Sequence, residues 1–112
     1  MVRRISWIKA ALRDFQVFPV AVHEQMTTAL RIAARGEKSD KAKPMRGLGT
    51  GVFEIALAYR GNAYRAVYAV QIGEDVWVIH AFQKKSTQGI KTPKREIDLI
   101  RARLKRLQET LP

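Results

Sequence analysis

Arginine and lysine side chains in the second half of the chain are the residues most suited to chemistry. Arg65 lies inside the apolar run AYRAVYAV, and Lys84 and Lys85 directly follow the last strand-like run. Guanidinium and ammonium groups that converge on one point stabilise the negative charge of a phosphate. A single arginine within a strand is more often the ion-pair partner of a carboxylate than a catalytic residue. Lys91 stands just before a predicted helix, whose N-terminus would also favour an anion.

Glu54 and His80 fall within predicted strands. Glu54 either faces solvent or pairs with a cation such as Arg65 across a hairpin. His80 has the same parity as Val78 and Phe82, which favours a half-buried histidine held by a hydrogen bond. Both residues are therefore predicted to position other groups.

The composition excludes several kinds of site. The chain has no cysteine and two histidines, which excludes disulfides, cysteine-ligated zinc and iron–sulfur clusters. No Walker loop, dinucleotide fingerprint, nucleophile elbow or HExxH motif occurs. The glycine-rich segment 47–51 precedes a strand, so it lacks the helix N-terminus of a phosphate cradle. We expect no metal and no small-molecule cofactor.

Positive charge is concentrated in two parts of the chain. The 112 residues carry a net charge of +11, and the excess of basic residues falls in segments 31–46 and 84–106. Charge segregated in this way is typical of proteins that bind phosphates or nucleic acids. A generally solubilising positive surface is the alternative.

The hydrophobic pattern predicts the elements that must position these side chains. They are a strand over 2–8, a short helix through Ile8, Leu12 and Phe15, a helix over 19–35, strands over 52–59, 63–72 and 76–82, and a last helix with Thr92 as N-cap and Pro93 as its first residue. The order β-α-α-β-β-β-α predicts a single α+β domain, residues 1–112, in which a small antiparallel sheet packs against helices. Helices are expected to cover one face of the sheet and to leave the other available for a ligand.

The chain shows no signal for a membrane or for export. No apolar run approaches the ~20 residues of a membrane span. The N-terminal segment MVRRISWIKAALRDF is basic but lacks the long apolar region and the cleavage site of a signal peptide. We therefore expect a cytoplasmic protein without a membrane partner.

Three runs carry a resemblance to a known family. GVFEI, YRAVYAV and VIHAFQKKSTQGIKTPKREIDLIRARL, together with a helix ending in ARG before Ala42-Lys43-Pro44, resemble RelE/HigB-type toxins, in particular their phage-derived HigB-like branch. The resemblance implies the toxin of a type II toxin–antitoxin system. Such a toxin is an endoribonuclease that cuts mRNA, either in dependence on the ribosome or without it. The resemblance further implies metal-independent attack by the RNA 2′-OH, no cofactor, and inhibition by a cognate helix-turn-helix antitoxin.

The resemblance also implies roles for individual residues. Arg65 would hold the scissile phosphate, and Lys84 and Lys85 would bind phosphate or act as the acid. Glu54 and His80 keep their positioning role. RNA-binding cations are expected at Lys43, Arg46, Arg60 and Lys91.

The chain departs from the family pattern at two places. Many relatives carry a basic residue where this chain has Ala56, and the C-terminal tyrosine of the RelE branch has no match. The general acid and base therefore remain open among Tyr59, Arg60, His80 and Lys84. A non-catalytic RNA- or ribosome-binding module, such as a degenerate toxin or a phage-encoded host modulator, is the alternative function.

Overall fold

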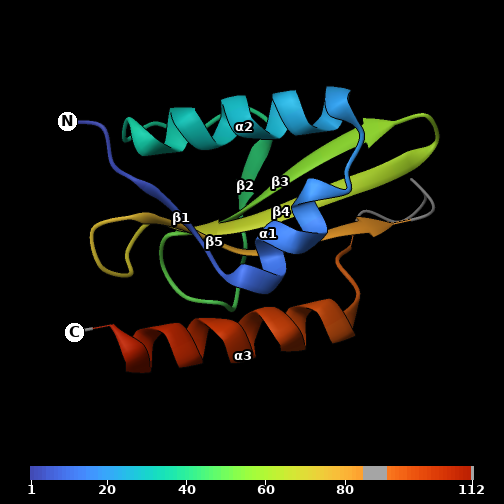
Figure 1. The fold of residues 1–112 in the computed structure, drawn as a ribbon. Coiled ribbons are helices and arrows are strands. Elements are labelled where there is room, and N and C mark those ends of the chain that lie inside the picture. The colour runs from blue at the N-terminus through green and yellow to red at the C-terminus, as the bar shows by residue number, and fades with distance from the viewer. Residues whose placement is uncertain (85–90, 112) are drawn as a thin grey trace.

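The computed structural model describes residues 1–84 and 91–111, within which three helices and five strands form (Figure 1). Along the chain these are β1 (Ile5–Trp7), α1 (Lys9–Gln16), α2 (Val20–Ala34), β2 (Ala42–Pro44), β3 (Val52–Tyr59), β4 (Asn62–Ala69), β5 (Val76–Lys84) and α3 (Lys94–Thr110). The predicted α+β architecture and the order of its elements are confirmed. The short strand β2 is an addition that the polar sequence of that segment did not indicate.

The five strands form one sheet in the order β1-β5-β4-β3-β2. β3, β4 and β5 are the predicted antiparallel meander, and β2 pairs antiparallel with the outer side of β3. β1 pairs with β5 in parallel, so the sheet is mixed at this edge rather than antiparallel throughout. A parallel pair needs a long crossover, which the chain between β1 and β5 provides.

The β3–β4 hairpin closes through Arg60 and Gly61. Both residues have positive φ, 50° and 79°, as a two-residue type I′ turn requires. Glycine adopts this conformation freely, whereas the Cβ of Arg60 makes it costly. The turn fixes a register in which Ala56 lies directly opposite Arg65.

Helices α1 and α2 cover one face of the sheet (Figure 1). The predicted stripe of α2, which includes Val22, Met26 and Leu30, packs in one cluster with Ile55 of β3 and Tyr68 of β4. Each of these five residues is at most 1% exposed. Burying an apolar side chain of this size stabilises a fold by about 1.5–3 kcal/mol, so this cluster is the main core.

Helix α3 covers the opposite face of the sheet and lies below it in Figure 1. Its residues Ile100, Leu104 and Leu107 form a second buried cluster with Val67 and Ile79. The expectation that this whole face stays available for a ligand is therefore wrong. Because the central strands carry apolar side chains on both faces, both faces need a helical cover.

An irregularity in the β4–β5 pairing changes which side chains of β5 share a face. Val67 pairs with His80 but Tyr68 pairs with Val78, so Ile79 is an extra residue, as in a β-bulge. Val78 packs with the α1–α2 cluster, whereas Ile79 packs under α3. The predicted parity of His80 with Val78 is therefore wrong, because the bulge turns His80 toward α3.

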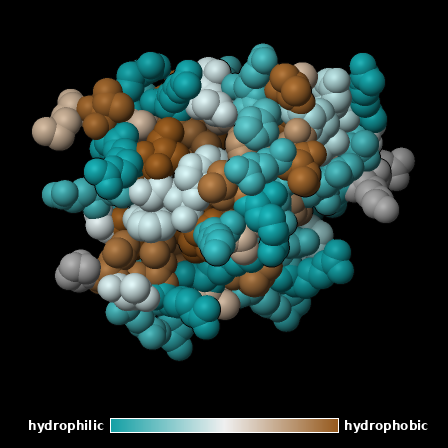
Figure 2. Space-filling view, in the orientation of Figure 1, coloured by the Kyte–Doolittle hydropathy of each residue, from teal (hydrophilic) through white to brown (hydrophobic). Residues whose placement is uncertain are grey.

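Helix α3 is amphipathic, with a buried apolar side and a polar outer side. Hydrophilic residues predominate along the lower border of Figure 2, where α3 lies. This pattern is typical of a surface helix that packs on a sheet. Within residues 1–84 and 91–111, no helix is both long enough and apolar enough to cross a bilayer.

Candidate functional site

Arg65 and Glu54 form an ion pair beneath the N-terminal end of α3. Arg65 Nη1 donates to Glu54 Oε1 at 2.8 Å, and the two side chains are only 10% and 13% exposed. Of the two alternatives for Glu54, the structure therefore shows the pair with Arg65. The Nε of Arg65 is buried and has no hydrogen-bond partner among the described residues. A buried donor of this kind is costly unless a ligand or water satisfies it.

Thr92 joins this pair from the segment that precedes α3. Its hydroxyl donates to Glu54 Oε2 at 2.7 Å, so both oxygens of one carboxylate accept hydrogen bonds. The prediction that Thr92 caps α3 is wrong: Pro93 occupies the N-cap position, and no side chain caps the helix. The hydroxyl is used to connect α3 to β3 instead.

A depression opens beside Arg65 at the hairpin end of the sheet. It is lined by Ala56, Leu57, Ala58, Ala63 and Arg65. Three of these residues are alanines, whose short side chains leave room above the strands. Arg65 thus combines a buried guanidinium with access to a hollow on the surface.

Lys84 ends β5 next to the same hairpin, with its Cα opposite that of Ala63. Its ammonium group donates to the carbonyl of Lys91 at 2.9 Å, which connects the end of β5 to the segment before α3. Lys91 itself is exposed. The predicted residue Lys85 lies outside the described residues.

His80 is held from both sides by residues of α3. Its Nε2 lies 2.7 Å from Glu96 Oε1, and Arg103 Nη1 lies 2.9 Å from its Nδ1. A guanidinium can only donate, so Nδ1 is the acceptor and the ring proton is on Nε2, which donates to Glu96. With both nitrogens engaged and 4% exposure, His80 is a structural connection in this geometry.

Arg103 also donates to the carbonyl of Ile79, at 3.1 Å, and so satisfies backbone at the bulge. Burial lowers the pKa of Arg103 from its ordinary value; nearby Arg13 acts in the same direction, whereas Asp14 and Glu96 oppose it. The lowered pKa reflects a guanidinium taken partly out of water. Arg103 therefore serves the packing of α3 on β5.

The remaining predicted cations are exposed, and they lie at different places along the sheet. Lys43 of β2 is the cross-strand partner of Glu54, so its side chain is on the same face as the ion pair. Arg60 stands at the hairpin tip with its guanidinium carbon 5.3 Å from the ring centre of Tyr59. Arg46 follows β2 beyond the other end of its pairing with β3.

Thr92, Glu96 and Arg103 were not recognised in the sequence as members of this site. Each meets a partner that is 16 to 38 positions away along the chain. The cationic spacing of α3 gave no sign that Arg103 differs from its exposed neighbours. Only the position of the bulge brings His80 within reach of it.

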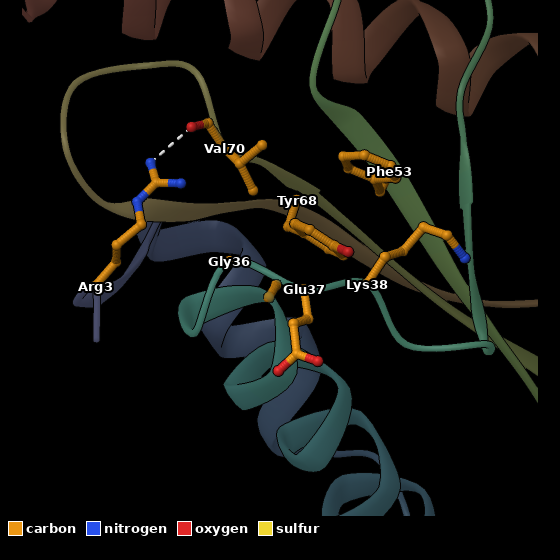
Figure 3. Close-up of a pocket in the computed structure, with 8 residues that line it drawn as sticks. Arg3, Gly36, Glu37, Lys38, Phe53, Tyr68 and Val70 are labelled. Atoms are coloured by element: carbon orange, nitrogen blue, oxygen red, sulfur yellow. Dashed lines mark hydrogen bonds between the residues drawn. The ribbon is translucent and has the colours of Figure 1, made fainter. Parts of the chain in front are cut away.

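A second hollow lies on the other face, between the end of α2 and the sheet (Figure 3). The rings of Phe53 and Tyr68 stack there with centroids 5.3 Å apart. Its cations are already engaged: Arg3 donates to the carbonyls of Val70, Glu74 and Asp75, and Lys38 to those of Ser39 and Ala42. These bonds hold loops in place, so the depression beside Arg65 is the better candidate site for an anion.

Within the part of the chain that the structure describes, no three histidine, aspartate or glutamate side chains gather where they could hold a metal ion. The site is instead a basic one. It consists of a buried arginine, its carboxylate partner and exposed lysines.

This fold matches those of solved RelE-type toxins. A substituted variant of the Escherichia coli toxin RelE in the free state matches with a TM-score of 0.64 at 20% identity, over 95% of this chain and 98% of that one. The isolated E. coli RelE toxin matches with a TM-score of 0.58 at 22% identity, over 89% and 98%. The toxin–antitoxin complex RelBE2 of Mycobacterium tuberculosis matches with 0.51 at 20% identity, over 77% and 95%.

The sequence itself matches the family of phage-derived Gp49-like proteins over residues 13–105. This match spans most of the chain, and the protein belongs to that family. No curated protein matches the sequence. The resemblance to phage-derived RelE-type toxins is thereby confirmed at the level of family and fold.

Proposed function

We propose that the protein is the toxin of a type II toxin–antitoxin system and cuts mRNA on the ribosome. The observation that carries this proposal is Arg65, a nearly buried arginine that lines a surface depression and whose Nε has no partner among the described residues. An RNA phosphate in the depression would bring acceptor oxygens to this guanidinium. The fold match to RelE toxins supports the same reading.

The chemistry needs no metal. The 2′-oxygen of the RNA bonds to the adjacent phosphorus as its proton leaves, and the bond from phosphorus to the 5′-oxygen breaks. That 5′-oxygen takes up a proton, which leaves a cyclic phosphate. Arg65 would hold the phosphate in line and offset the charge that develops on it. Lys84 and Lys85 would add positive charge or supply the proton to the leaving oxygen.

Glu54 keeps the guanidinium of Arg65 in place in this proposal, and His80 keeps α3 on β5. Lys43, Arg46, Arg60 and Lys91 would bind the RNA backbone, because exposed cations attract phosphates without reading sequence. A helix-turn-helix antitoxin would inhibit the enzyme by covering Arg65 and Lys84. The M. tuberculosis relative is seen in a complex of toxin and antitoxin. Because its proposed substrate is mRNA on the ribosome, the proposed activity is cytoplasmic.

The test is primer extension on a reporter mRNA after brief induction of the protein. We expect new 5′ ends with the wild-type chain, none with Arg65→Ala, and ends at the wild-type sites with Arg13→Ala, an exposed arginine of α1. Cleavage reactions of the purified protein, with and without ribosomes, decide whether the ribosome is required. Absence of new ends from the wild-type chain, on ribosomes and on free RNA, would contradict the proposal.

One observation favours the non-catalytic alternative, an RNA- or ribosome-binding module. Ala56 lies directly opposite Arg65 in the sheet and lines the same depression, so a basic residue of the family pattern is missing beside the phosphate position. Growth arrest without any new 5′ ends would favour this alternative. In that case Ala56→Arg, which adds the missing positive charge, should produce new 5′ ends if the rest of the site is intact.

A further inference from the structure

Helix α3 carries a row of exposed cations on one side of its outer surface. Lys94, Arg101 and Lys105 are separated by seven and four residues, so they project from the same side of the helix. The Lys94 and Arg101 side chains are 90% and 57% exposed, and Lys105 is exposed as well. The row spans about 16 Å at a rise of 1.5 Å per residue. None of the three belongs to the buried clusters.

The row continues into the basic segment that contains β2. Arg101 Nη2 approaches the carbonyl of Gly47 at 3.5 Å, which places Arg101 beside the loop that also carries exposed Arg46. Lys43 precedes this loop and lies across from Glu54. Cations from two distant parts of the chain therefore form one surface that begins beside Arg65 and extends along α3.

Asp98 lies within the row and makes exposed contacts of 3.2 Å with Lys94 and 3.6 Å with Arg101. Exposed ion pairs of this kind contribute little to stability, so Lys94 and Arg101 stay available to bind an anion. Each cation also keeps further N–H donors for an incoming anion. The row is thus a positive surface weakened at one point by a carboxylate.

We propose that this surface, Lys43, Arg46, Lys94, Arg101 and Lys105, binds the backbone of the single RNA strand that flanks the cut phosphate. The inference rests on the proposed function, because it assigns the track on which that substrate lies. Helix α3 has no aromatic residue, so it offers no platform on which bases could stack, and contact would be made with phosphates alone. Lys43 lies on the same face as the Arg65–Glu54 pair, so this surface continues from the depression. The continuity favours the RNA strand that is cut there as the ligand, over a separate acidic partner.

The test measures binding of a 2′-O-methyl RNA oligonucleotide, which cannot be cut, by fluorescence anisotropy across a salt series. The variant is Lys94→Gln/Arg101→Gln/Lys105→Gln. The control of equal charge is Lys9→Gln/Arg31→Gln/Arg35→Gln, whose residues lie in α1, in α2 and directly after α2. Loss of three phosphate contacts should make the slope of log affinity against log salt shallower by about 2 for a single strand. The control should keep the wild-type slope. Equal slopes for both triple variants would overturn the inference.

Asp98→Asn gives a test in the opposite direction, which misfolding cannot imitate. Removing the carboxylate should raise affinity for a long oligonucleotide several-fold, whereas Glu24→Gln on α2 should leave it unchanged. A gain confined to ribosomes or to an acidic antitoxin peptide, with none on the oligonucleotide, would assign the row to that partner and contradict our proposal. Cleavage assays on the same variants distinguish a failure of this inference from a failure of the proposed function. If the wild-type chain cuts RNA and the triple variant binds the oligonucleotide as the wild type does, the RNA-binding surface is refuted but the nuclease is not.

Discussion

Thr92 and Glu54, 38 positions apart in the chain, are joined by a hydrogen bond of 2.7 Å from the threonine hydroxyl to Oε2 of the carboxylate. The other oxygen of Glu54 accepts from Arg65 at 2.8 Å. One carboxylate therefore connects the segment before α3, the strand β3 and the arginine of the candidate site. Its negative charge pairs with Arg65, and each of its two oxygens accepts a hydrogen bond.

Glu54→Gln should destabilise the fold by about 3 kcal/mol, because it leaves the nearly buried Arg65 without its counter-charge. A glutamine also has one acceptor oxygen, so its NH₂ group must face one of the two donors. Urea denaturation measures the free energy of unfolding. Asp98→Asn, which removes a carboxylate from exposed pairs, should change it by less than about 1 kcal/mol. Equal losses in the two variants would show that burial of the Arg65 pair has no energetic consequence.

The protonation of His80 can be read directly by long-range ¹⁵N–¹H correlation spectra. We expect a protonated Nε2 and an unprotonated Nδ1, because Arg103 can only donate to Nδ1. Arg103→Gln removes the donors to His80 and to the carbonyl of Ile79, and it should lower stability by about 1–3 kcal/mol. Arg106→Gln, an exposed neighbour on the same helix, is the control. A protonated Nδ1 in the wild-type protein would contradict this arrangement.

The fold was largely predictable from sequence because its signals are local. The period of α2, the alternation of β3 and the turn at Arg60 and Gly61 each depend on a few neighbouring residues. β2 was missed because its three residues form a strand only through pairing with β3. The bulge at Ile79 was missed for the same reason, since simple alternation places every second residue of β5 on one face.

The candidate site was predictable in part. The pair of Glu54 and Arg65 could be anticipated because both lie in one hairpin, whose register the turn fixes. Thr92, by contrast, is a residue type typical of a helix N-cap, but Pro93 occupies that position and the hydroxyl of Thr92 bonds to Glu54 of β3. Such long-range partners depend on how α3 packs across the sheet, which no local pattern encodes.

Arg60→Asn should stabilise the hairpin by about 0.5 kcal/mol. Arg60 has a φ of 50°, which costs an ordinary side chain about 1–2 kcal/mol, whereas asparagine tolerates it. Loss of the contact between Arg60 and Tyr59 offsets part of the gain, since an exposed cation–π contact contributes about 0.5–1 kcal/mol. Thermal unfolding measures the effect. Arg60→Ala removes the same charge without easing the backbone and should not stabilise; a similar gain from both would attribute the effect to charge.

Tyr68 is 1% exposed, and its ring stacks on Phe53 in the hollow of Figure 3. Burial raises the pKa of its hydroxyl from 10.0 to about 12, because the phenolate would lose its hydration. The neutral form is therefore favoured by folding. Between the two pKa values the unfolded chain has released this proton and the folded chain has kept it.

The contribution of Tyr68 to stability should be complete below pH 10 and should be lost as the pH rises toward about 12. Within this window the free energy of unfolding should fall by about 1.4 kcal/mol for each pH unit on account of this residue alone. Urea denaturation at several alkaline pH values measures the slope for the wild-type chain and for Tyr68→Phe, which keeps the ring and removes the hydroxyl. Lysines that titrate in the same range affect both proteins equally, so the difference between the two slopes isolates Tyr68. Parallel curves for the two proteins would show that this hydroxyl titrates normally and that the hollow beside Phe53 is open to water.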